Sequence, residues 1–178
     1  LVTEGGGFKN VHPGSDLLEF YKPDYVIVQL GIVDCSPRYI SVESITFKIL
    51  NNLPKFIQNL YYKFKKKFST RKLKYAYVSS DVYRSNLTNY LNRAKRNNTK
   101  VILCAIAPIA KSFIEKSPEI QLAIKRYNTI LKELSNSYDN VDYFNPYPND
   151  FSETCLLDEL HFNHLGHYFF CEQLIKFD

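Results

Sequence analysis

Four side chains that could carry chemistry lie within ten positions near the end of the chain. They are Asp158, His161, His164 and His167, in the stretch LLDELHFNHLGHYFF, and each follows the last by three residues. Three residues advance an α-helix by about 300°, so four side chains at this spacing would fan over half of its surface. A zinc site on one helix uses two histidines four residues apart, and that spacing is absent. We therefore expect no metal site here and no cofactor.

The same residues indicate an acid–base pair if a helix begins near Asn163, whose side chain could cap it. Asp158 and His161 would then lie in the loop before that helix. A carboxylate three residues before a histidine in a turn can accept the Nδ1 hydrogen, fix the tautomer and stabilise the imidazolium. Asp158 would be the orienting group and His161 the general base of a hydrolytic triad, with an ordinary core or surface histidine as the alternative. His164 and His167 are expected to be structural.

Short strands alternating with helices must position this pair. Apolar runs rich in β-branched residues predict buried strands at 23–31, at 100–108 and, as a weaker copy, at 140–148. Alternation of this kind predicts a parallel sheet between two layers of helices, in one domain that spans residues 1–178. Functional sites in such sheets form just beyond the carboxyl ends of the strands. The loops to search are therefore 31–38, 108–111 and the loop before the last helix.

Helical patterns fill the segments between these strands. The first is expected from about residue 42 to 68, with a break at Leu53-Pro54 because proline lacks the amide hydrogen that a helix interior uses. A second covers 80–98, with Ser80 or Asp81 as its cap. A third follows Pro118, with an apolar face formed by Leu122, Tyr127, Ile130, Leu131 and Leu134.

The composition is that of an ordinary globular domain, with 45% hydrophobic and 23% charged residues, which excludes disordered and fibrous classes. No apolar run reaches the roughly 18 residues of a membrane span, and the start LVTEGGGFKN lacks the layout of a signal peptide. The four cysteines form no CxxC pair and are expected to be free thiols. Free thiols and the lack of a signal favour the cytoplasm.

The net charge of +5 is concentrated in a basic helical segment at about 43–75, where Lys63–Lys74 alone holds seven Lys or Arg. One interpretation is a solvated helix face. The other is a surface for an anionic polymer or a membrane, where the interleaved Phe64, Phe68 and Tyr75 could pack or stack. No nucleic-acid partner is expected.

Three stretches resemble conserved blocks of the SGNH, or GDSL, hydrolase family. DELHFNHLGH resembles the last block, VIVQLGIVDCSPR the third and EGGGFKNVHPGSDLLEF the second, and Pro108 after its strand is also similar. The resemblance implies a flavodoxin-like α/β/α sandwich with Asp158 and His161 as triad orienter and base. It also implies an oxyanion or substrate-binding role for a further set of residues: Gly6, Gly7, Gly31, Asp34 and Arg38.

The chain departs from the family pattern in two places. The family's nucleophile lies in a strand followed by Gly-Asp-Ser, and no such block is present in the 178 residues. Leu1 and Val2 read as the tail of a strand, so the first strand and the serine are expected upstream of residue 1, with Ser15 and Ser36 as weaker candidates. Val33 stands where the family has its oxyanion asparagine. Either another group donates, such as a backbone amide of residues 5–7 or the side chain of Gln29 or Arg38, or the activity is weak.

The resemblance implies a serine esterase that hydrolyses O-acyl esters, with an O-acetylated carbohydrate or polysaccharide as the expected substrate. Arg38 could instead bind a carboxylate or phosphate of the substrate, or form an ion pair on the surface. The alternative is a binding or assembly module that keeps the fold without turnover, and both Val33 and the absent serine favour it.

Overall fold

The centre of the molecule is a parallel sheet of three strands in the order β1-β4-β5. The computed structural model describes residues 18–38, 44–68, 75–148 and 151–177, with the backbone alone at 37–38, 65–68 and 75. The strands are β1 (Tyr25–Val28), β4 (Lys100–Cys104) and β5 (Val141–Phe144). The three expected strands and their parallel pairing are confirmed, although each strand is shorter than its apolar run.

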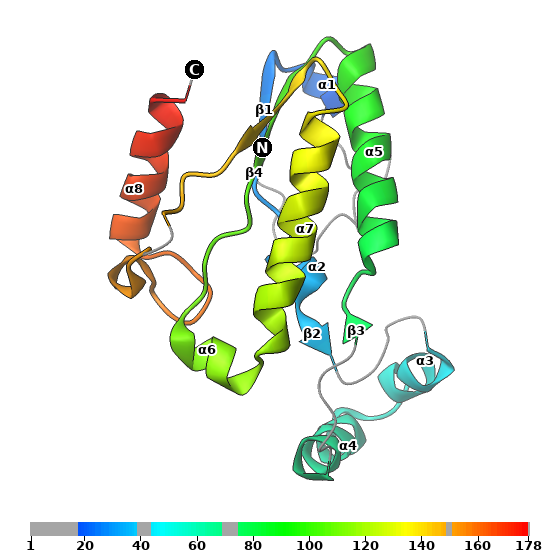
Figure 1. The fold of residues 1–178 in the computed structure, drawn as a ribbon. Coiled ribbons are helices and arrows are strands. Elements are labelled where there is room, and N and C mark those ends of the chain that lie inside the picture. Colours follow the sequence, from blue (N-terminus) through cyan, green and yellow to red (C-terminus); the bar gives the residue numbers. More distant parts are fainter. Residues whose placement is uncertain (1–17, 39–43, 69–74, 149–150, 178) are drawn as a thin grey trace.

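Two long helices, α5 (Ser80–Arg96) and α7 (Glu119–Ser135), cover one face of this sheet (Figure 1). Val101 and Leu103, alternate residues of the central strand, are fully buried in the same core as Leu87 and Leu91 of α5. Alternate residues of a strand point to one face, and residues four apart on a helix lie on one side, so each element contributes one apolar surface. The main core lies between these surfaces.

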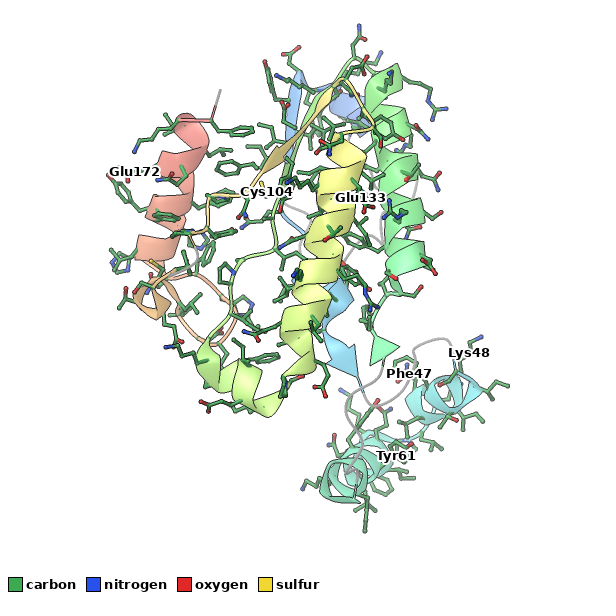
Figure 2. The ribbon with its side chains drawn as sticks, viewed as in Figure 1. Phe47, Lys48, Tyr61, Cys104, Glu133 and Glu172 are labelled. Carbon is green, nitrogen blue, oxygen red and sulfur yellow. The ribbon has the colours of Figure 1, made fainter. Side chains whose placement is uncertain are left out.

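A single helix, α8 (His164–Ile175), covers the opposite face. Cys104 of β4 and Phe144 of β5 are buried with Phe170 of α8, and the centroids of the two phenylalanine rings lie 5.7 Å apart. Figure 2 labels Cys104 between the sheet and α8. Helices therefore lie on both faces of a parallel sheet, which confirms the expected three-layer α/β/α architecture.

Residues 39–74 form a long excursion from the body of the molecule. A two-stranded antiparallel sheet joins both ends of this excursion to the body. After β1, the one-turn helix α2 (Ile32–Cys35) leads into β2 (Pro37–Arg38), which pairs antiparallel with β3 (Tyr75–Ala76). Between these two strands the chain forms α3 (Ile45–Asn51) and α4 (Lys55–Phe68), so the predicted break at Leu53-Pro54 is confirmed. Both helices lie beyond β2 and β3, away from the sheet layers (Figure 1).

Three shorter helices complete the described residues: α1 (Leu18–Tyr21), α6 (Lys111–Lys116) and the 3-10 turn η2 (Glu153–Cys155). The expected cap of α5 was wrong, because the hydroxyl that accepts the Val82 N–H belongs to Ser79 and not to Ser80 or Asp81. The prediction that Leu122 belongs to the apolar face of α7 was also wrong. Leu122 is exposed, while the other four residues of that predicted face are buried.

The four cysteines are free thiols, as expected: Cys35 and Cys104 are buried, Cys155 is half-buried and Cys171 is exposed. Among the described residues, no helix combines the length and the hydropathy that a bilayer crossing requires.

Candidate functional site

Asp158 and His161 form a hydrogen-bonded pair in the loop before α8. Nδ1 of His161 lies 2.8 Å from Oδ2 of Asp158. The side chain of His161 is 73% exposed, and within the described residues its Nε2 has no hydrogen-bond partner. An ionised carboxylate can only accept, so the hydrogen resides on Nδ1 and Nε2 is the basic nitrogen. This nitrogen is free to accept a proton from a group that approaches from solvent.

The backbone of the same loop holds Asp158 in its charged form. Oδ1 accepts hydrogen bonds from the backbone N–H groups of Leu160 and His161, each at 2.8 Å. The Leu160 amide, then the His161 ring and then the His161 amide lower the pKa of Asp158 to about 2. Donors that bind the charged form of a carboxyl favour that form. Asp158 is therefore an anion at any ordinary pH.

Asn163 fixes the loop to the first turn of α8. Its Oδ1 accepts from the N–H groups of Leu165 and Gly166 at 2.9 and 3.1 Å, which is the predicted helix cap. Its Nδ2 donates to the carbonyl oxygens of Thr154 and Leu156 at 2.7 and 3.1 Å. One side chain thus joins η2, the loop and α8, and it does so two residues after His161.

Gly166 allows α8 to approach η2 closely. A Cβ atom at this position would lie 2.3 Å from the backbone oxygen of Cys155 and 3.0 Å from the side chain of Phe162. Because the first of these atoms belongs to the backbone, no side-chain rotation could relieve the contact. The close packing of α8 against η2 therefore explains the glycine at position 166 without any catalytic role.

The loop is also tied to the segment that follows β4. The carboxylate of Glu159 accepts from Lys116 Nζ at 2.5 Å and from Ser112 Oγ at 2.7 Å, and its backbone oxygen accepts from the Ala110 N–H at 3.1 Å. Lys116, followed by Ser112, lowers the pKa of Glu159. Two of the three strand-end loops selected from the sequence therefore meet in space.

Gly31 lies at the end of the neighbouring strand β1, and its backbone requires glycine. Its φ of 127° is in a region that other residues rarely adopt. A Cβ there would lie 2.7 Å from Cδ1 of Ile106, in the segment after β4. The structure thus places Gly31 at the carboxyl edge of the sheet, where it lets the ends of two strands approach each other.

Asp34 lies in the core, in contrast to the exposed Asp158. It is fully buried in α2, and among the described residues neither of its carboxyl oxygens has a hydrogen-bond partner. Burial raises the pKa of Asp34 to about 6. Burial, followed by the charge of Asp34, raises the pKa of the adjacent Cys35 thiol to about 12. Asp34, which was expected to have an oxyanion or substrate-binding role, follows β1 but is turned inward by α2.

A hydrogen bond that no sequence pattern indicated lies at the carboxyl edge of the sheet. Nε2 of Gln29, just after β1, donates to the hydroxyl of Tyr147, just after β5, at 3.2 Å. The Tyr147 ring lies 6.0 Å from that of Phe162, the neighbour of His161. Gln29 and Tyr147 are 118 positions apart in the sequence, so only the parallel pairing of the strands brings them together. Gln29, one of the expected oxyanion donors, thus lies at the carboxyl edge of the sheet.

The remaining two histidines of the cluster lie on the surface of α8. His164 and His167 are exposed in the first turns of α8, and the His167 ring packs edge-on against Phe162 at 5.8 Å. In the described part of the chain, no three His, Cys, Asp or Glu side chains are placed to hold a metal ion.

Several predicted site residues lie outside what the structure describes. Gly6, Gly7 and Ser15 belong to residues 1–17, and at Arg38 only the backbone is described. Of the rest, Ser36 donates to the carbonyl of Ile32 at 2.5 Å within its own turn. Val33, which lies in α2, is 43% exposed.

Comparison with known proteins shows a distant likeness to a solved structure. No protein-family model and no curated protein matches the chain. A solved structure from Streptococcus pneumonia, described as "a putative platelet activating factor", is 18% identical with a TM-score of 0.46. The match covers 55% of this chain and 50% of the other, so the chain spans about half the length of that structure. The chemistry of the site rests on its own residues.

Proposed function

We propose that this chain is a serine esterase of the SGNH type, in which His161 is the general base and Asp158 its orienting partner. The observation that carries the proposal is the 2.8 Å contact between Nδ1 of His161 and Oδ2 of Asp158, in a loop joined to the carboxyl edge of a parallel sheet. That contact leaves Nε2 as a basic nitrogen that faces solvent. The resemblance of the surrounding block to the SGNH family adds the reaction class.

The nucleophile is a serine outside the described residues. Its hydroxyl attacks the carbonyl carbon of an ester while Nε2 of His161 takes the proton. The tetrahedral intermediate collapses as His161 returns that proton to the departing alcohol, and a serine acyl ester remains. Water then attacks this ester with His161 again as base, which releases the carboxylic acid and the free serine. Asp158 stays ionised throughout and stabilises the imidazolium that forms twice.

The oxyanion needs hydrogen-bond donors that Val33 cannot supply. Removal of one such donor from an esterase site typically costs about 2.7 to 4 kcal/mol of transition-state stabilisation. Backbone amides of Gly6 and Gly7, the amide of Gln29 and the guanidinium of Arg38 are the candidates. Gln29 is favoured among the described residues, because its contact with Tyr147 places it beyond the strand ends.

The proposed substrate is a small O-acyl ester, with an O-acetylated carbohydrate as the class that the family resemblance suggests. The reaction needs no metal or organic cofactor.

Hydrolysis of an aryl acetate by the full-length protein tests the proposal. His161→Ala should lower kcat/KM by at least about a hundredfold, the usual minimum contribution of a general base. His164→Ala is the matched control, because His164 is an exposed histidine three residues away in the first turn of α8. Equal rates for wild type and His161→Ala would overturn the assignment of the base. Absence of hydrolysis in the wild type would favour the alternative, a binding module that retains the fold.

A further inference from the structure

The two helices of the excursion between β2 and β3 carry large apolar side chains that are exposed to solvent. On α4, Phe56, Leu60 and Phe64 are 70%, 54% and 55% exposed. They are spaced by four residues, so they form one continuous stripe along the helix. On α3, Ile45 and Ile49 are also exposed and also four apart. Large aliphatic and aromatic side chains arranged in stripes are typical of a surface that contacts an apolar partner.

The charge of this segment is entirely of one sign. Between Ser44 and Ser80 the sequence holds nine Lys or Arg and no Asp or Glu, whereas the rest of the chain has a net charge of −4. Lys63 is exposed on α4 beside the stripe, and Lys48 is exposed on α3, where Figure 2 labels it. An unbalanced positive charge of this size selects an anionic partner.

Hydrogen bonds fix both the start of α3 and the turn between α3 and α4. The hydroxyl of Ser44 caps α3 by accepting from the Phe47 N–H at 3.1 Å. Nε2 of Gln58, on the first turn of α4, donates to the carbonyl of Leu53 at 2.8 Å. The apolar stripe of α4 therefore lies on a helix whose first turn is hydrogen-bonded to the turn before it, and Figure 1 shows α3 and α4 beyond β2 and β3, away from the sheet layers.

We propose that α3 and α4 form a docking surface for a membrane that contains anionic lipids. A basic helix with an aromatic and aliphatic stripe lies in the plane of a bilayer interface, with the stripe among the acyl chains and the lysines at the headgroups. An anionic polymer in water would use the lysines but would leave Leu60, Ile45 and Ile49 exposed. The lipid surface is thus the partner that accounts for both the charge and the apolar stripe. This inference is independent of the esterase proposal.

Co-sedimentation of the full chain with vesicles tests it. We expect binding to vesicles of phosphatidylcholine mixed with phosphatidylglycerol, and little binding to vesicles of phosphatidylcholine alone. Phe56→Ser should weaken the binding about tenfold, since each fully buried aromatic contributes roughly that much. Phe20→Ser is the matched control, because Phe20 is 77% exposed on α1, outside the segment. Lys63→Glu should weaken binding about tenfold or more, and Lys125→Glu on α7 should not.

Two results would overturn the inference. The first is the absence of binding to the anionic vesicles at low salt. The second is binding to a soluble polyanion such as heparin that equals binding to vesicles and that Phe56→Ser leaves unchanged, which would assign the surface to an anionic polymer. Circular dichroism of each variant should match the wild type, since the substituted side chains are exposed.

Discussion

At the scale of the residue, the charge of Asp158 is fixed by its own loop and not by burial. Two backbone amides and the His161 ring hold its pKa near 2. A carboxyl whose pKa is lowered by folding stabilises the folded state above its unfolded pKa of 3.8, and that stabilisation is lost as the pH falls toward about 2. Loss of activity in mildly acidic solution would therefore come from another group.

Asp158→Asn tests the orienting role separately from the fold. The amide nitrogen of the new asparagine would face Nδ1 of His161 as a donor. The imidazole would then either carry its hydrogen on Nε2 or lose the contact. We expect kcat for aryl acetate hydrolysis to fall by about a hundredfold or more, with little change in KM. Asp139→Asn is the control, since Asp139 is another exposed carboxylate, paired with Lys95. Unchanged kcat in Asp158→Asn would show that the pair is only structural.

Asp34 gives the opposite pH dependence, because burial raises its pKa from 3.8 to about 6. A raised carboxyl pKa means that the folded state holds the proton more tightly, so the free energy of unfolding decreases as the pH rises through this interval. The difference of the two values corresponds to about 3 kcal/mol. Asp34→Asn cannot ionise and should remove this dependence. Urea unfolding at about pH 4 and about pH 7 measures it. A variant that is less stable than the wild type at neutral pH would contradict the account.

At the scale of the element, the start of α8 determines where His161 lies. Gly166→Ala would place a Cβ 2.3 Å from the backbone oxygen of Cys155, so α8 and η2 must separate. We expect a loss of about 1 to 3 kcal/mol in the free energy of unfolding and reduced hydrolysis, since the loop moves with the helix. Cys171→Ala, an exposed position on the same helix, should change neither. A Gly166→Ala variant as stable as the wild type would show that the close approach is not required.

The elements were predictable where one local rule acts alone. The apolar runs located β1, β4 and β5, and Asn163 was recognised as a cap because its type and position suffice. The cap of α5 was displaced by one residue because Ser79 and Ser80 are chemically equivalent in sequence. The direction of Asp34 and the contact of Gln29 with Tyr147 depend on turn geometry and on distant pairing, so no local rule could find them. The predicted roles of Gly6, Gly7 and Arg38 stay predictions.

At the scale of the whole molecule, the body and the excursion between β2 and β3 are separate in architecture. Pro37 pairs with Ala76 and Arg38 with Tyr75, so the chain returns to its starting point after residue 74. Replacement of residues 39–74 by Asn-Gly, the preferred two-residue hairpin turn, should therefore leave one cooperative thermal transition. Leu91→Ala in the fully buried core of α5 is the contrast and should cost about 2 to 5 kcal/mol. Loss of cooperative unfolding in the shortened chain would show that α3 and α4 are part of the core.

The proposed esterase chemistry requires that His161, held by Asp158, activates a serine. Labelling of the full-length protein with a fluorophosphonate, followed by mass spectrometry, tests it most directly because the reagent reacts with activated serines. We predict an adduct on a single serine at a rate that His161→Ala lowers by at least about a hundredfold and that His164→Ala leaves unchanged. An unlabelled protein, or a labelling rate that is the same in His161→Ala and the wild type, would contradict the account.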